Sequence, residues 1–402
     1  MTISVLPHSP DPRSVAKPDI PSNAASNLAL AAAAKVVAAL PLGRRMDPPR
    51  HVLVVRLGNV GDIVVAIPAF RALRALYPQA KLTLLTSPTR RGAPGAREVL
   101  ANDPIFDDMI VYYEDESGHP DFLGLLRRRL LDSAVDLAIV LPNHMTTLGN
   151  LAKFLALFAA SGIRRAAGCR LVEPVDFQGP QADRLIEIVS ALGPASVPPF
   201  PWLTVSEADA LAAKEMTDPA NAPVIIGMHV GAQRPSNRWP VGRFVSLGRL
   251  LLEKPGRAIV LTGSAGEAGL TAAVARELGE RCVDLAGRTT LGQLAAVASR
   301  CRVFVSNDTG AMHMAYAVGT PVAVLFGGRY FPKVWYPYGE GHAVLRKEIE
   351  CSPCLSESCP LYAEPECLAR IDAKEAAHAV EAILAREEGP PCGASMRAPD
   401  SQ

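Results

Sequence analysis

The stretch that decides the fold runs from Val303 to Gly328 and reads V-F-V-S-N-D-T-G-A-M-H-M-A-Y-A-V-G-T-P-V-A-V-L-F-G-G. A β-branched run at 303–305 leads into a polar turn, and a short apolar segment with helical spacing follows from Thr309. A second apolar run at 322–326 ends at two glycines. The pattern predicts strand, turn, helix and strand, which is a repeating unit of an α/β fold with a parallel sheet.

The turn 306–310 should face a ligand, because open parallel sheets bind ligands at the carboxyl ends of their strands. A helix that begins near Thr309 would present free N–H groups and a positive dipole end, which suits phosphate oxygens. Gly310 has no Cβ and would let an anion approach the backbone. Asp308 would instead accept hydrogen bonds from sugar hydroxyls. The alternative is that Asp308 or Thr309 only caps the helix.

A similar unit opens the fold at His51. The sequence predicts a buried strand at 52–57, a glycine-rich turn at 58–62, a helix at 63–76 and a strand at 81–86. Pro68 should bend that helix or restart it. Asp62 ends the turn, where a carboxylate could act as a general base by removing a proton from an attacking hydroxyl. Helix capping is again the alternative.

Strands and helices alternate along the rest of the chain. The predicted strands lie at 109–112, 137–141, 224–231, 258–261 and 283–285, and the predicted helices at 181–192, 207–216, 241–252, 268–278 and 291–298. Two α/β domains of this kind should face each other across a cleft, where ligands usually bind.

Polar residues follow several of these strands. Asn143 and His144 could contact an acceptor, although a histidine in a loop is more often an ordinary surface residue. The loop at 232–240 combines basic and aromatic side chains, which suits a nucleotide diphosphate because arginine forks onto its oxygens. An acidic residue in the next loop would bond ribose hydroxyls. The candidate donor-binding residues in these loops are Gly231, Arg234, Asn237, Arg238 and Glu267.

The length of 402 residues allows two core-bearing domains, since single cores stop growing near ~250–300 residues. We expect a disordered tail at 1–48, a first domain at 49–195, a linker at 196–222, a second domain at 223–387 and a disordered tail at 388–402. Apolar residues make up 49% and charged residues 20% of the chain, as in soluble globular proteins.

No apolar run reaches the ~20 residues that span a bilayer, and no secretory signal is evident. We therefore expect a cytoplasmic protein with at most peripheral membrane contact. The formal charge of +1 does not indicate a partner, and we expect no nucleic acid. The basic clusters at 127–129 and 164–165 could meet an anionic acceptor or form solvated helix faces.

Three segments, taken in order, resemble glycosyltransferase family 9, the heptosyltransferase family of lipopolysaccharide core synthesis. They are V-V-R-L-G-N-V-G-D-I-V-V-A-I-P-A at 54–69, H-V-G-A-Q-R-P-S-N-R-W-P at 229–240 and S-N-D-T-G-A-M-H-M-A at 306–315. The resemblance implies a GT-B architecture, with two Rossmann-like domains around a central cleft. The second domain would hold most of the donor nucleotide, and the first would hold the acceptor.

The resemblance also implies roles for individual residues. Asp62 would be the catalytic base of a displacement that inverts the anomeric carbon. The N–H groups of Thr309 and Gly310 would bind the diphosphate, Asp308 would bind the transferred sugar, and His313 would contact the donor or brace the loop. The candidate acceptor-binding residues are Gly58, Asn59, Gly61, Asn143 and His144.

The middle segment departs from the family pattern at Asn237, where many relatives carry lysine. Arg234 or Arg238 would then supply the positive charge. No metal or other cofactor is required by this chemistry, because N–H groups, a helix dipole and arginine can stabilise a leaving diphosphate.

Four cysteines form a second outstanding feature, with the spacing Cys351-x2-Cys354-x4-Cys359-x7-Cys367. So many thiols in a short, proline-containing stretch could wrap a structural zinc ion. Only the first pair has a typical zinc spacing, so disulfides, free thiols and an iron–sulfur cluster remain alternatives.

The leading hypothesis is an inverting glycosyltransferase that moves heptose from a nucleotide sugar, with ADP-heptose as the expected donor. Its acceptor would be a lipopolysaccharide core or a similar lipid-linked or core oligosaccharide. The alternatives are another donor and acceptor on the same fold, a nucleotide-sugar epimerase that needs no acceptor, and a noncatalytic nucleotide-sugar binding protein, because fold does not determine function.

Overall fold

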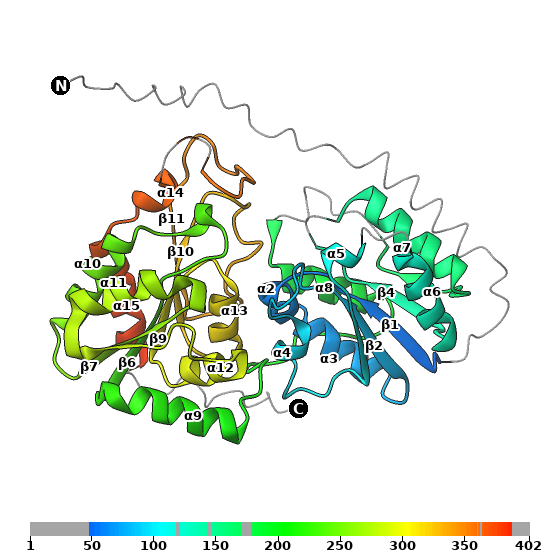
Figure 1. The fold of residues 1–402 in the computed structure, drawn as a ribbon, viewed down its shortest axis with the longest axis horizontal. Helices are drawn as coiled ribbons and strands as arrows, with labels where there is room; N and C mark the ends of the chain where they lie inside the picture. Colours follow the sequence, from blue (N-terminus) through cyan, green and yellow to red (C-terminus); the bar gives the residue numbers. More distant parts are fainter. Residues whose placement is uncertain are drawn as a thin grey trace, which may run out of the picture.

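The structure is a computed structural model that describes residues 48–117, 121–143, 146–169, 178–359, 361 and 364–387. Two parallel α/β bodies lie side by side in it, one from each half of the chain (Figure 1). The tail predicted at 388–402, and all but the last residue of the tail predicted at 1–48, lie outside the described residues. Among the described helices, none combines the length and apolarity needed to cross a membrane.

The N-terminal half contains a five-stranded parallel sheet in the order β3-β2-β1-β4-β5. The strands are β1 (His51–Val55), β2 (Lys81–Thr86), β3 (Asp108–Val111), β4 (Leu137–Val140) and β5 (Ala166–Ala167). The helices are α2 (Val60–Val64), α3 (Ile67–Leu76), α4 (Ala96–Val99), α5 (Glu114–Ser117), α6 (Phe122–Asp132), α7 (Leu148–Ala160) and α8 (Gln181–Ser190). The chain changes direction across the sheet between β1 and β4, which is where such sheets bind ligands.

The C-terminal half contains a six-stranded parallel sheet in the order β11-β10-β9-β6-β7-β8, which is the Rossmann order. The strands are β6 (Val224–His229), β7 (Arg257–Thr262), β8 (Cys282–Asp284), β9 (Val303–Asn307), β10 (Val322–Phe326) and β11 (Ala343–Arg346). The helices are α9 (Glu207–Thr217), α10 (Val241–Leu252), α11 (Ala268–Leu278), α12 (Leu291–Ser299), α13 (Gly310–Ala317), α14 (Glu366–Ala369) and α15 (Ala373–Glu387). Here the direction changes between β6 and β9.

The predicted unit at 303–328 is confirmed as β9, α13 and β10. The single helix predicted at 63–76 is instead two helices, since α2 begins at Val60 and α3 begins at Ile67. Pro68 is therefore the restart that the sequence allowed. It lies in the first turn of α3, where the missing N–H group of proline breaks no helical hydrogen bond.

The predicted linker, residues 196–222, packs against the C-terminal half. The backbone N–H groups of Trp202 and Leu203 both donate to the carbonyl oxygen of Ala317, at 2.7 and 3.0 Å. The Trp202 side chain is fully buried, stacks on Phe200 and meets the edge of Tyr316. Helix α9, which follows, packs on α12. These contacts fix the path of the chain between the two sheets.

The two halves meet where the first turn of α2 packs against the first turn of α13 (Figure 1). A Cβ at Gly61 would lie 2.7 Å from Cδ2 of His313, and a Cβ at Gly310 would lie 2.9 Å from Cβ of Val60. Both helices therefore need glycine to come this close. Buried residues from both halves, including Val60 and Met312, belong to one apolar cluster.

We predict that Gly61→Ala destabilises the protein, by about 1–3 kcal/mol, because the added methyl group overpacks the junction against His313. Gly269→Ala is the matched control, since Gly269 also lies in a helix and its added Cβ would meet nothing within 4 Å. The control should raise stability by roughly 0.5–1 kcal/mol. Urea unfolding measures both changes, and equal effects would contradict the close packing of α2 on α13.

Candidate active site

Arg56 organises the ligand-binding edge of the N-terminal sheet. Its side chain is fully buried, and Nη1 donates to the carbonyl oxygens of Leu141 and Pro142 at 3.2 and 2.9 Å. Its Nε donates to the carbonyl oxygen of Asp62 at 3.0 Å. One guanidinium thus links the ends of β1 and β4, which is where the chain changes direction. Sequence reasoning assigned Arg56 no role, although a charged residue at the end of a buried strand was a visible signal.

Asp62 lies at the third position of α2 with its side chain one-fifth exposed. The exposed fraction is 20%, so the side chain is partly open to solvent. Its Oδ2 accepts from the N–H of Asn59 at 3.1 Å, and its Oδ1 lies 3.5 Å from Nη2 of Arg56. Gly58 makes room for this carboxylate, with a φ of +137° that only glycine readily adopts. Asp62 therefore does contribute to capping α2, and one face of it remains accessible.

Burial raises the pKa of Asp62 above its ordinary value, and the charges of Arg56 and Arg234 and the N–H of Asn59 oppose that rise. A carboxylate with a raised pKa is a stronger base once it is ionised. Asp62 thus has the accessibility and the proton affinity that a general base needs.

Asn307 organises the matching edge of the C-terminal sheet. Its Nδ2 donates to the carbonyl oxygens of Val230 and Gly231 at 2.9 and 3.0 Å, and its Oδ1 accepts from the N–H of Trp239 at 3.0 Å. The ends of β6 and β9 and the loop 232–240 are held together by this one side chain. The asparagine of the S-N-D-T-G turn is therefore a structural residue.

Asp308 is half-buried at the end of β9. Nδ2 of Asn237 donates to its carbonyl oxygen and to its Oδ2, both at 3.1 Å. Burial raises the pKa of Asp308 to about 7, against the opposing effects of Arg234, Arg329, Asn237 and Arg346. Asn237 therefore holds Asp308 in place rather than supplying charge. Asp308 is able to accept or to donate a hydrogen bond near neutral pH.

Thr309 precedes α13 in an extended conformation, and its side chain makes no capping hydrogen bond. The hydroxyl lies 3.4 Å from Oγ of Ser306 instead. The capping alternative is therefore wrong for this side chain. Val60 fills the position of the missing Cβ of Gly310, so glycine here permits the close packing of α2 on α13.

The positive charges of three arginines act on Asp308, and two of these arginines, Arg329 and Arg346, were not predicted from the sequence. Arg329 is buried, its Nη1 donates to the carbonyl oxygen of Ser356 at 2.6 Å, and its guanidinium lies 4.9 Å from the ring centre of Tyr330. The Nη1 of Arg346 donates to two backbone carbonyl oxygens. In the described part of the chain, the Nε atoms of Arg234, Arg329 and Arg346 have no hydrogen-bond partner. Arg329 was predictable, because it follows β10 after only two glycines and the other candidates also lie just after strand ends.

Two further candidate donor-binding residues form hydrogen bonds within their own loops. The Nε of Arg238 donates to the carbonyl oxygen of Ala232 at 2.8 Å. The Oε2 of Glu267 accepts from the backbone N–H and the hydroxyl of Ser264 at 2.8 and 2.7 Å. The Glu267 carboxylate also lies against Gly231, so the ends of β6 and β7 adjoin there.

His313 is buried at the junction of the halves. Its Nδ1 lies 3.1 Å from the hydroxyl of Tyr316, and its ring packs on Gly61. Burial lowers the pKa of His313 to about 3, so the ring is neutral at physiological pH. This placement matches the bracing alternative that the sequence left open.

The acceptor-side candidates lie at the ends of β1 and β4. Oδ1 of Asn59 accepts from Oγ1 of Thr89 at 3.4 Å, which connects the loops after β1 and β2. The N–H of Asn143 donates to Oγ1 of Thr146 at 3.0 Å, which folds the loop after β4 into a turn. His144 lies outside the described residues.

The four cysteines of the 351–367 segment are free thiols. Sγ of Cys367 accepts from the N–H of Gly328 at 3.2 Å. In the part of the chain that the structure describes, no three His, Cys, Asp or Glu side chains are grouped as ligands of one metal ion. The predicted zinc site is therefore not preformed in these positions.

The sequence profile of glycosyltransferase family 9 (heptosyltransferase) matches residues 124–363. The chain belongs to glycosyltransferase family 9. It is 30% identical over 306 residues to lipooligosaccharide heptosyltransferase 2 of Haemophilus ducreyi, a match that covers 69% of this chain and 83% of the relative. It is 29% identical over 304 residues to lipopolysaccharide heptosyltransferase 2 of Escherichia coli K12, covering 69% and 82%.

Solved structures confirm the GT-B fold of this glycosyltransferase. The E. coli ADP-heptose lps heptosyltransferase II superposes with a TM-score of 0.64 at 23% identity, covering 84% of this chain and 100% of that one. A family 9 glycosyltransferase from Veillonella parvula gives a TM-score of 0.67 at 21% identity, covering 85% and 99%. The fold class and the family resemblance inferred from the sequence are both confirmed.

The raised pKa of Asp308 predicts a pH-dependent stability for this glycosyltransferase. Between the ordinary value of 3.8 and the folded value of about 7, the folded state binds more protons than the unfolded state, so its stability falls as the pH rises. Asp308→Asn removes this loss. The melting temperature of the variant, relative to the wild type, should therefore increase from pH 4 to pH 8.

The exposed Asp132→Asn variant serves as the control and should show no such trend. If the difference in melting temperature between Asp308→Asn and the wild type stayed constant over this pH range, the surroundings of Asp308 would not disfavour its charge.

Proposed function

We propose that this glycosyltransferase moves heptose from ADP-heptose to a lipopolysaccharide core or a similar glycan acceptor, with inversion at the anomeric carbon. Membership of the heptosyltransferase family and the names of the relatives support the sugar and the kind of acceptor. A lipid-linked acceptor would bring the protein to the inner face of the membrane as a peripheral protein.

Asp62 is the catalytic base in this proposal. It takes the proton from an acceptor hydroxyl, whose oxygen then bonds to the anomeric carbon from the side opposite the diphosphate. The bond from that carbon to the phosphate oxygen breaks, and the electron pair leaves with the nucleoside diphosphate. Direct displacement of this kind inverts the configuration. The raised pKa of Asp62 and its partial exposure suit it to this role.

The diphosphate lies, in this proposal, at the first turn of α13. The N–H groups of Thr309 and Gly310 are placed at the positive end of that helix. Arg234 and Arg329 add positive charge beside them, while Asp308 bonds the hydroxyls of the heptose. The leaving charge is then stabilised by arginines and a helix dipole, so we propose that the chemical step needs no metal ion.

The observation that carries the proposal is the position of Arg234. Its positive charge opposes the burial-driven rise in the pKa of Asp62 in the N-terminal half and of Asp308 in the C-terminal half. One cation therefore acts on both carboxylates across the junction. A donor bound beside Arg234 would have its sugar near Asp308 and within reach of the base.

The competing proposal is that the protein uses another donor or acceptor on the same fold. The residue that supports this alternative is Asn237. This side chain is committed to Asp308, so the charge that a lysine would bring at this position is missing. A different donor sugar would contact Asp308 and Asn237 in this proposal.

The proposal is tested by measuring heptosyl transfer. The purified protein is incubated with ADP-heptose and a heptose-deficient core acceptor, with GDP- and UDP-linked sugars in parallel, and the product is analysed by mass and by proton NMR of the new anomeric centre. We expect a heptosylated product from ADP-heptose, with inverted configuration and unchanged rate after chelation. Retention of configuration, or conversion of the donor without any acceptor, would overturn the proposal.

We predict that Asp62→Asn lowers kcat by ~10²–10⁴-fold, the usual contribution of a general base, while the Kd for ADP stays within about twofold of the wild type. Asp132→Asn is the matched control on the surface of the same half and should leave both quantities unchanged. Single-turnover assays and calorimetric ADP titration measure the two. Turnover that survives Asp62→Asn would remove Asp62 from the mechanism.

A further inference from the structure

Two helices of the N-terminal half carry most of the large apolar side chains that are exposed. Among the described residues there are seven such side chains, and four of them lie on α6 and α7: Leu123, Leu125, Leu131 and Leu148, with exposed fractions of 51, 63, 42 and 43%. The two helices lie side by side on the edge of the N-terminal half that faces away from the C-terminal half (Figure 1). Single exposed leucines are common, whereas a cluster on neighbouring helices indicates a binding surface.

Arginines alternate with leucines along α6. Leu123, Arg127 and Leu131 are spaced four residues apart and form one row along the helix. Leu125, Arg128 and Leu131 are spaced three apart and form a second row. All five side chains are exposed. A basic amphipathic helix of this kind is typical of proteins that lie on a membrane surface.

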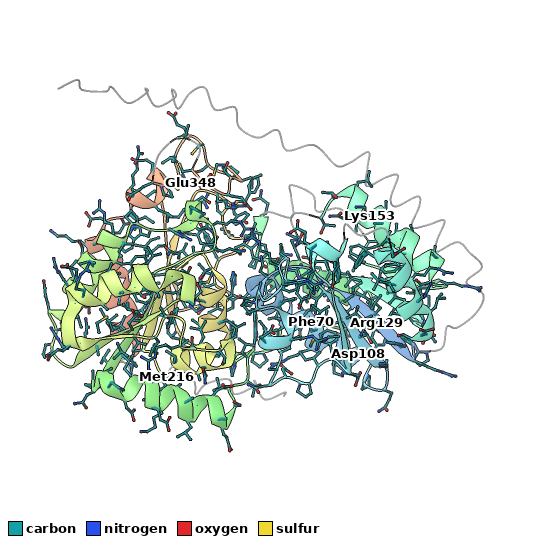
Figure 2. All side chains as sticks on the ribbon, viewed as in Figure 1. Phe70, Asp108, Arg129, Lys153, Met216 and Glu348 are labelled. Atoms are coloured by element: carbon teal, nitrogen blue, oxygen red, sulfur yellow. The ribbon has the colours of Figure 1, made fainter. Side chains whose placement is uncertain are left out.

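Helix α7 extends this face. Its sequence contains one charged residue, Lys153, and its other exposed positions are Leu148, a glycine, an asparagine and alanines. Nε of Arg127 donates to the carbonyl oxygen of Ala160 at 2.8 Å, which joins α6 to the end of α7. Figure 2 labels Arg129 on α6 and Lys153 on α7, both in the N-terminal half. The two helices thus present one continuous apolar and basic face.

The positive charges of this face are not neutralised within the protein. In the ranges that the structure describes, no salt bridge engages the four cations of the two helices, which are Arg127, Arg128, Arg129 and Lys153. The one acidic residue within α6 and α7 is Asp132, and Arg164, just after α7, is exposed as well. The complementary partner is therefore anionic.

Both helices begin at the edge of the sheet that is proposed to bind the acceptor. The ring of Phe122, at the start of α6, lies 5.0 Å from the ring of Tyr112, which directly follows β3. Helix α7 begins at Leu148, after the loop that follows β4 and contains Asn143. A surface bound to this face would therefore lie beside the carboxyl ends of β3 and β4.

A second copy of the chain would not complement this face. A symmetric dimer places the same patch of both copies in contact, so the arginine rows would repel each other. A layer of anionic lipid satisfies both kinds of side chain. Leucines enter the boundary of the acyl chains, while arginine stems lie along apolar surface and keep the guanidinium groups among the phosphates.

We propose that the exposed face of α6 and α7 binds an anionic lipid surface. Its leucines enter the lipid layer, and Arg128, Arg129 and Lys153 contact the phosphate groups. The contact holds the acceptor edge beside the surface from which a lipid-linked acceptor extends. Lipid binding is independent of the proposed function, whereas this effect on transfer rests on it.

The first test is flotation of the full-length protein with vesicles. Vesicles of phosphatidylglycerol and phosphatidylethanolamine in equal parts should bind the protein, with an affinity that falls as salt is added, and vesicles of phosphatidylcholine alone should bind it weakly. Arg128→Gln/Arg129→Gln should weaken binding to the anionic vesicles roughly 25-fold, about fivefold for each charge. Arg276→Gln is the control, because Arg276 is exposed on α11 in the other half and its loss should leave binding unchanged.

The apolar contribution is tested separately. Leu125→Ser/Leu131→Ser should weaken binding to the same vesicles by about tenfold or more, because two inserted side chains are lost. Leu211→Ser on α9 is the control, since Leu211 is 61% exposed and lies in the other half. All four variants should melt with the wild type, because the changed side chains are exposed.

Three results would overturn the lipid assignment. One is equal binding to phosphatidylcholine and to the anionic vesicles. Another is unchanged binding in either double variant. The third is a dimer in sedimentation without vesicles that Leu125→Ser/Leu131→Ser abolishes, because the face would then be an interface between copies of the chain.

The second test compares heptosyl transfer to two forms of acceptor. Arg128→Gln/Arg129→Gln should slow transfer to an acceptor embedded in the anionic vesicles and leave transfer to a water-soluble acceptor fragment unchanged. Equal rates of the variant and the wild type on the embedded acceptor would overturn the effect on transfer. Failure of the wild type on both acceptors would instead count against the proposed function, because flotation decides the lipid contact without donor or acceptor.

Discussion

The close contact between the first turns of α2 and α13 is the constraint on which the rest of the structure depends. Two glycines, Gly61 and Gly310, let the helices touch, with His313 and Val60 filling the space that side chains would take. Each helix starts at the point where its own sheet changes direction, so the contact brings the two ligand-binding edges together. The positive ends of both helices then lie close together at these edges.

The site holds charges in places that disfavour them. Burial raises the pKa of both Asp62 and Asp308, and Arg56 is fully buried beside Asp62. A protein built only for stability would not keep such groups, whereas perturbed carboxylates in a crevice are typical of catalytic sites. The buried cations and the asparagines around them are the structural supports that make these carboxylates tolerable. Asn237 donates to Asp308, and Asn307 joins the ends of β6 and β9 beneath it.

Much of this fold was predictable from local sequence. Helices α10 and α11 and strands β2 and β10 begin and end at the predicted residues, because their apolar periodicity is strong and their ends are clear. Helix α15 was missed, although Ala376, Val380, Ile383 and Leu384 have helical spacing and are buried. Helix α7 and the short strands β5 and β11 give weaker signals, since one is almost wholly apolar and the others are two and four residues long.

The candidate site was predictable in outline but not in its partners. Strand ends located Asp62, Asp308 and Arg234, and the same rule would have added Arg329. The packing of Val60 on Gly310, and the support that Ser356 gives to Arg329, join residues far apart in the chain. Local pattern carries no information about such contacts, and they decide which side chains are committed to the structure and which face a ligand.

The most direct measurement is the crystal structure of the protein with bound ADP. We expect a diphosphate at the first turn of α13, within hydrogen-bonding distance of the N–H groups of Thr309 and Gly310 and of the guanidinium of Arg234 or Arg329, with open space between its outer phosphate and Asp62. A diphosphate bound away from α13, or one whose outer phosphate points away from Asp62, would contradict this expectation.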